Sequence, residues 1–98
     1  MFGFIQQWLD RRRQLRALWK ADARILLRAN ERTAYYEAQR LVARSRARGD
    51  NHGFWHWAKV AAEIARLSDN VEMDLATLKA IAAEELNGAR KTEFERPN

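Results

Sequence analysis

The sequence predicts an all-α protein, a small bundle of four helices built on a central antiparallel helical hairpin. Three observations predict this class. Long stretches of the 98 residues contain no helix breaker, because there are only four glycines and the one proline stands at position 97. Alanine, leucine and arginine, which favour helix, are frequent along the chain. Apolar residues recur at helical spacing in successive segments.

The first expected helix covers residues 3–29 and the second covers residues 31–48. Each has one apolar stripe, but at about 100° per residue the second stripe is rotated by roughly 120–140° from the first. One straight helix would therefore point its two apolar stripes in different directions. This predicts a break near Asn30, a residue type that can cap a helix or end one in the left-handed conformation.

The third expected helix covers residues 51–67, after a turn in which Gly49 supplies a positive φ and Asp50 or Asn51 caps the helix. The second and third helices then form an antiparallel hairpin. The apolar sector of the third helix covers well over half of its circumference, which predicts contacts on two sides and the central place in the bundle. Phe54 and Trp57 are expected in the core. Trp55, at the edge of the sector, is either a half-buried boundary residue or a contact residue for a partner.

The fourth expected helix covers residues 74–86, with Asp74 as its N-cap and Gly88 as the residue that ends it. Residues 1–88 are thus predicted to form one helical domain. The last ten residues, 89–98, lack periodicity and are expected to be a mobile tail.

The third helix also has a polar sector, made of His52, His56, Lys59, Glu63 and Arg66. Two histidines one turn apart can chelate a divalent ion, but no third strong ligand is adjacent. We expect a solvated face without a metal or any other cofactor. The sequence has no serine or cysteine in a nucleophile-elbow motif and no glycine-rich phosphate loop, which argues against an enzyme and against a small-molecule substrate.

The N-terminal segment is predicted to be a partner-binding tip. At about 26 residues the first helix would be ~39 Å long, whereas hairpin helices of about 18 residues would be ~27 Å, so about two turns should overhang. Exposed apolar residues there need a cover, and we expect it to be a protein partner or a second copy of the chain. The tip consists of Phe2, Phe4, Ile5, Trp8 and Leu9.

Basic residues are concentrated in the first half of the chain. The net charge is +5, and residues 1–48 hold twelve basic side chains against four acidic ones, while residues 69–98 hold four against seven. This asymmetry favours an anionic partner, nucleic acid or an anionic membrane surface, or else an internal acidic face that includes Glu72, Glu84 and Glu85. The predicted basic surface consists of Arg11, Arg12, Arg13, Arg16, Arg32, Tyr36, Arg40 and Arg44.

The hairpin resembles short uncharacterised helical proteins of alphaproteobacterial type, in which a Gly-Asp turn is followed by a tryptophan and a V-A-x-E-I run. The matching residues are Gly49, Asp50, Trp57, Val60, Ala61, Glu63 and Ile64, within a segment of about a third of the chain. The resemblance implies a bacterial, cytoplasmic setting and no particular activity.

Location and function follow from these features. The absence of cysteine fits a reducing compartment, and the N-terminal order of apolar before basic residues is the reverse of a signal peptide. We expect a cytoplasmic, non-catalytic interaction module that binds a protein partner or itself. The alternative is peripheral binding to an anionic membrane or to nucleic acid through the arginine-rich helices.

Overall fold

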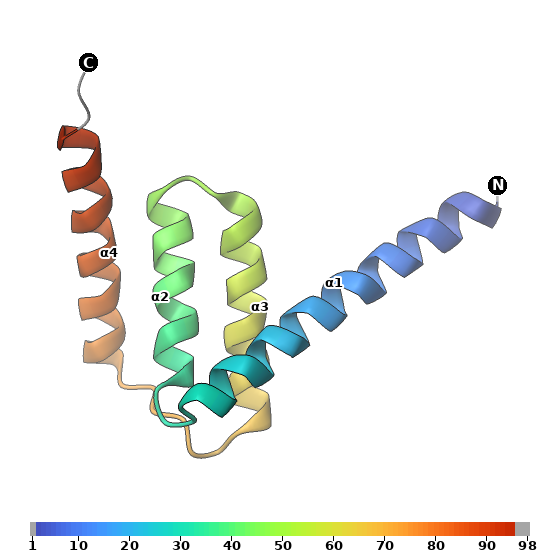
Figure 1. The fold of residues 1–98 in the computed structure, drawn as a ribbon, viewed down its shortest axis with the longest axis horizontal. Coiled ribbons are helices and arrows are strands. Elements are labelled where there is room, and N and C mark those ends of the chain that lie inside the picture. The colour runs from blue at the N-terminus through green and yellow to red at the C-terminus, as the bar shows by residue number, and fades with distance from the viewer. Residues whose placement is uncertain (1, 96–98) are drawn as a thin grey trace.

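The computed structural model describes residues 2–95, except for the side chains at positions 2, 4 and 92–95. This part of the chain consists of four α-helices and contains no strand, which confirms the all-α prediction (Figure 1). The helices are α1 (Phe2–Ala29), α2 (Ala34–Ala47), α3 (Asn51–Leu67) and α4 (Leu75–Glu95).

The break near Asn30 is confirmed. α1 ends at Ala29, and the Asn30 side-chain oxygen accepts a hydrogen bond from the Thr33 backbone N–H at 3.4 Å. α2 begins at Ala34, three residues later than expected. The reason is that the intervening residues hold the connection between α3 and α4: the Glu31 carboxylate accepts hydrogen bonds from Ser68 and Asn70 at 2.6 and 3.0 Å.

The hairpin turn has the predicted chemistry. Gly49 has a φ of 71°, and the Asp50 side chain accepts a hydrogen bond from the Gly53 backbone N–H at 2.9 Å. A Cβ atom on residue 53 would collide with the Asp50 carboxylate and approach the Ser45 hydroxyl to 2.7 Å. Glycine at position 53 therefore lets the capping carboxylate and the end of α2 lie close to the first turn of α3.

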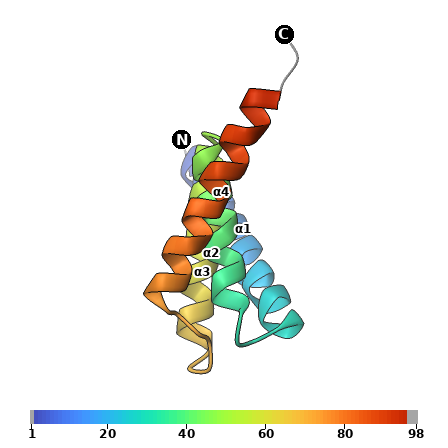
Figure 2. The same ribbon diagram turned by 90° about the vertical axis from the view of Figure 1, so that its left-hand side faces the viewer.

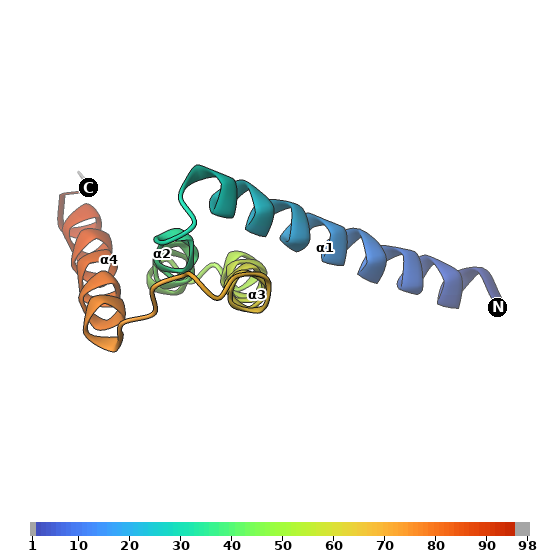
Figure 3. The same ribbon diagram turned by 90° about the horizontal axis from the view of Figure 1, so that it is seen from below.

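The central helix is α2, and the prediction that α3 would occupy this place is wrong. Seen from below, α4, α2 and α3 lie side by side in that order, while α1 crosses one face of the hairpin (Figure 3). α2 contacts all three other helices, whereas α3 contacts only α1 and α2 in the described part of the chain. α3 has a broad apolar sector, but some of that sector remains in solvent, as at Leu67.

The buried core lies where α1 crosses the hairpin and is made mostly of small side chains, which allow the helices to approach closely. Its members are Ala23, Ala34, Ala38, Val60, Ala61 and Ile64. Trp57 is half-buried and packs against this cluster, so it lies at the border of the core. Phe54 is also half-buried and does not pack against the cluster, which corrects its predicted place in the core.

α4 extends further than predicted. Asp74 caps it as expected, accepting hydrogen bonds from the Thr77 backbone N–H and hydroxyl at 3.0 and 2.9 Å. The helix then runs through Gly88 to Glu95, and its last turns extend past the end of the hairpin (Figure 2), so the expected end near Gly88 is wrong. One glycine costs a helix only about 1 kcal/mol, and good helix formers follow it. Residues 89–95 of the expected tail are helical, and residues 96–98 lie outside the described residues.

Candidate binding surface on the first helix

The N-terminal half of α1 projects away from the rest of the molecule (Figure 1). Every described side chain before Trp19 is exposed, and Trp19 is the first half-buried one. We call residues 2–16 the arm. It is longer than the two turns expected from the sequence, because α1 crosses α3 obliquely and leaves the hairpin early. The side chains of Phe2 and Phe4, which belong to the predicted tip, lie outside the described residues.

The arm carries an exposed apolar face. Ile5 and Trp8 are 58% and 53% exposed, and Leu9 and Leu15 are exposed beside them. Positions 5, 8, 12, 15 and 19 follow one another at intervals of three or four, so they share one side of the helix. On that side Trp19 packs against the buried core. The arm thus exposes to solvent a continuation of the stripe by which α1 packs on the hairpin.

Four arginines lie on the arm, and two of them, Arg12 and Arg16, lie on the side of its apolar face. The Arg12 guanidinium carbon lies 4.7 Å from the centre of the Trp8 ring, a cation–π contact. Arg11, Arg13 and Arg16 are exposed. The one acidic residue of the arm, Asp10, lies on the opposite side of the helix from the apolar face. The arm therefore combines an apolar face with a strong local positive charge.

A groove of about 640 Å³ lies where α1 diverges from α3. Trp55, expected either at a half-buried boundary or at a contact, is 63% exposed here, so the half-buried alternative is wrong. Sequence reasoning did not assign the groove, because it is formed by residues from two distant segments that no local pattern connects. The groove is lined by Leu15, Trp19, Asn51, His52, Trp55, His56 and Lys59.

The predicted polar sector of α3 is only partly solvated, because α1 crosses it. His52 is exposed, but the His56 ring nitrogen Nε2 lies 2.7 Å from an Asp22 carboxylate oxygen on α1. Glu63 is buried and accepts two hydrogen bonds from Arg66, at 2.6 and 3.2 Å, and this arginine lowers the pKa of the Glu63 carboxyl. Among the residues that the structure describes, no group of three or more potential ligands could hold a metal ion.

Two arginines of α2, Arg40 and Arg44, are paired with carboxylates of α4, which corrects their interpretation as part of a free basic surface. Arg40 lies 2.9 Å from Glu84 and 3.2 Å from Glu85, and Arg44 donates two hydrogen bonds to Glu85, both at 3.1 Å. The bonds from Arg44 lower the pKa of the Glu85 carboxyl. Of the two sequence-based alternatives for these arginines, the structure shows the internal acidic face.

The remaining two members of the predicted α2 surface are also engaged. Arg32 and Glu72 form an ion pair at 2.6 Å, and the Tyr36 hydroxyl accepts a hydrogen bond from the Asp74 backbone N–H at 2.8 Å. These contacts lie at the start of α4 and attach it to α2. On α2 itself, Arg40 and Arg44 are one turn apart, and this spacing lets both of them bond to Glu85 of α4.

The net positive charge consequently belongs to α1. This helix contains seven basic and two acidic residues, a balance equal to the net charge of +5 of the whole chain, whereas residues 30–98 contain eleven basic and eleven acidic residues. Because the charges of residues 30–98 sum to zero, the excess positive charge of the chain lies on the projecting helix.

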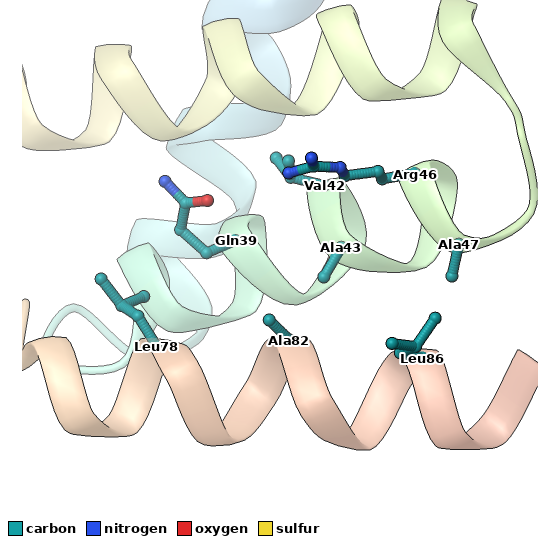
Figure 4. A pocket seen from close by; sticks show the side chains of 8 residues that line it. All are labelled: Gln39, Val42, Ala43, Arg46, Ala47, Leu78, Ala82 and Leu86. Atoms are coloured by element: carbon teal, nitrogen blue, oxygen red, sulfur yellow. The ribbon is translucent and has the colours of Figure 1, made fainter.

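A second groove, of about 550 Å³, separates α2 from α4 (Figure 4). Leu78, Ala82 and Leu86 of α4 line it opposite Ala43 and Ala47 of α2. The small alanines leave space between the two helices there, while Ile81 is buried. This groove is therefore a part of the contact between α4 and α2.

Comparison of the chain with protein-family models, with curated proteins and with solved structures found no match. No helix of the described residues is long and apolar enough to cross a bilayer.

Proposed function

We propose that this protein is a small non-catalytic interaction module that binds a protein partner through the arm. The observation that carries the proposal is the exposure of an apolar stripe that, further along the same helix, is covered by the hairpin. Ile5, Trp8 and Leu9 are exposed large apolar side chains, and exposed patches of this kind are typical of interaction sites. Tryptophan and arginine, which meet at Trp8 and Arg12, are enriched in interface hot spots.

The charge distribution supports a second candidate, peripheral binding to an anionic membrane or to nucleic acid. α1 holds the net charge of the chain, and a basic amphipathic helix with aromatic side chains is typical of membrane-surface segments. This candidate and the first use the same arm. They differ in what covers the apolar face, so one pair of variants can distinguish them.

The test compares two double variants of the full-length protein. Ile5→Ser/Trp8→Ser changes the arm, and Leu18→Ser/Ile25→Ser changes two equally exposed apolar residues elsewhere on α1. Both should keep the helical signal and the thermal midpoint of the parent, because exposed side chains contribute little to folding. We expect only the arm variant to lose self-association, measured by light scattering, or to lose the capture of proteins from an extract of producing cells.

Two outcomes would contradict the proposal. One is that the parent and the arm variant capture the same proteins and have the same molar mass in solution. The other is a monomeric parent that captures no protein but sediments with anionic vesicles, or shifts nucleic acid in a gel, in a way that the arm variant abolishes. That second outcome would replace the protein partner with the anionic surface.

A further inference from the structure

We propose that the groove between the arm and α3 binds an amphipathic helix of a different protein, one with acidic side chains beside its apolar face. The inference rests on the proposed function, since it names the chemistry of the partner that the arm would bind. It extends the binding surface from the arm onto α3, where Trp55 lines the groove and is 63% exposed.

The shape of this surface favours a helix over a flat partner. Leu15 and Trp19 line the groove together with Trp55, so the apolar face of α1 points to the side on which α3 lies. A flat surface, such as a bilayer, that approached the whole of this face would meet the hairpin first (Figures 1 and 3). A helix about 10 Å across can lie in the angle between the arm and α3.

The spacing along α1 is that of a helix-packing seam. Positions 5, 8, 12, 15 and 19 alternate intervals of three and four residues, the pattern with which one helix packs along another. At the end of this series Trp19 already packs against the core. The arm of residues 2–16 continues the seam for roughly 22 Å, or four helical turns, which suits a partner helix of about 15 residues.

Charge complementarity indicates that the partner helix is acidic. Arg12 and Arg16 lie on the apolar side of the arm, and the amino group of Lys59 lies 5.8 Å from the centre of the Trp19 ring in the groove. Among the described residues, none that lines the groove carries a carboxylate. Acidic side chains beside the apolar face of a partner would pair with these cations and set its register.

The same charges argue against a second copy as the occupant. Two arms packed together through their apolar faces would bring Arg12 and Arg16 of both copies close together, while Asp10 lies on the far side of each arm, and like charges in contact are destabilising. The acidic helix α4 is also a poor match, because Glu84 and Glu85 are already bonded to Arg40 and Arg44. These two points leave a different protein as the occupant.

The test uses a fluorescently labelled synthetic helical peptide titrated with the full-length protein at low salt. The peptide has leucines at alternating intervals of three and four residues and glutamates on both flanks of this seam. We expect a one-to-one complex by fluorescence anisotropy. Replacing the glutamates with lysines, or the leucines with serines, should each weaken binding at least about tenfold, because both charge and apolar contact contribute.

Variants of the protein locate the peptide. Ile5→Ser, on the arm beyond the groove, and Trp55→Ala, at a residue that lines the groove, should each weaken binding at least about tenfold, as expected for interface anchors. Ile25→Ser is the matched control, because Ile25 and Ile5 are 59% and 58% exposed on the same helix, and it should bind like the parent. Equal unfolding midpoints of all three variants would show that the fold is intact.

Three results would overturn the inference: no peptide complex tighter than about 1 mM, equal affinities for the glutamate and lysine peptides, or no effect of Trp55→Ala. Binding to phosphatidylglycerol vesicles that Ile5→Ser abolishes and Trp55→Ala does not would identify a lipid surface as the occupant. If capture of cellular proteins still depends on the arm while the peptide does not bind, the inference fails and the proposed function stands. If neither depends on the arm, both fail.

Discussion

Replacing Glu85 with glutamine should loosen α4 from α2. Glu85 is only 13% exposed and is bonded to both Arg40 and Arg44, the latter through two hydrogen bonds of 3.1 Å. Hydrogen bonds to charged groups contribute about 1.5–3 kcal/mol when well protected, and partly exposed ion pairs contribute less. Both arginines are partly exposed, so we expect Glu85→Gln to reduce the free energy of unfolding by about 1–2 kcal/mol.

The assay is equilibrium unfolding in urea followed by helical circular dichroism, with Glu84→Gln as the matched control. Glu84 is 62% exposed and, among the described residues, bonds only to Arg40, so its replacement should cost no more than about 0.5 kcal/mol. The difference between the two variants should shrink in 1 M salt, because salt screens the Arg–Glu attraction. Equal losses for Glu84→Gln and Glu85→Gln would refute the assignment of Glu85 as the carboxylate that holds α4.

Three further predictions concern the core, the glycines and acid. Ile64→Ala, at a fully buried site, should cost about 2–5 kcal/mol in urea unfolding, while Ile25→Ala should stay within about 0.5 kcal/mol; similar losses would contradict the assigned core. Gly88→Ala should raise the thermal midpoint by removing a flexible residue from α4, whereas Gly49→Ala should lower it because φ is 71° there. Arg66, which is bonded to Glu63, lowers the pKa of the Glu63 carboxyl from 4.5. The contribution of Glu63 to stability is therefore present above pH 4.5 and is lost as the pH falls through the pKa of the folded state. Urea midpoints measured across pH should decline more steeply in acid for the parent than for Glu63→Gln.

Local chemistry made the helix boundaries at the hairpin predictable. The positive φ of Gly49 and the capping bond of Asp50 depend on residues within a few positions of each other, so the sequence shows them directly. The break at Asn30 was visible because two apolar stripes were out of phase. The end of α4 was not, since Gly88 is compatible with both a helix end and a helix interior, and nothing nearby decides between them.

The central place of α2 could not be predicted from apolar periodicity. One side of α2 is covered by α4 through Arg40 and Arg44, and a helix face that packs through ion pairs looks solvent-exposed in sequence. Conversely, Trp55 widens the apolar sector of α3 although it lies in solvent. The apolar pattern therefore predicted the contact of α1 with the hairpin, but it did not predict the contact of α4 with α2.

The groove beside the arm, like the place of α2, could not be predicted from the apolar pattern of the sequence. The exposed residues of the tip, such as Ile5 and Trp8, were predicted because the first helix is too long for the hairpin. Their relation to Trp55 depends on the angle at which α1 crosses α3, and that angle is set by small core residues outside the tip, such as Ala23 and Ala61. A crossing angle leaves no signature in either helix alone.

α1 has one further mechanical consequence. The arm and the segment that packs against the hairpin form a single uninterrupted helix of 28 residues, which is about 42 Å long. It has no loop that could act as a hinge between them. A partner bound at the N-terminal end is therefore held at a fixed distance from the hairpin. A sideways force on that partner acts as a torque on the contact between α1 and α3, with the oblique crossing as the pivot.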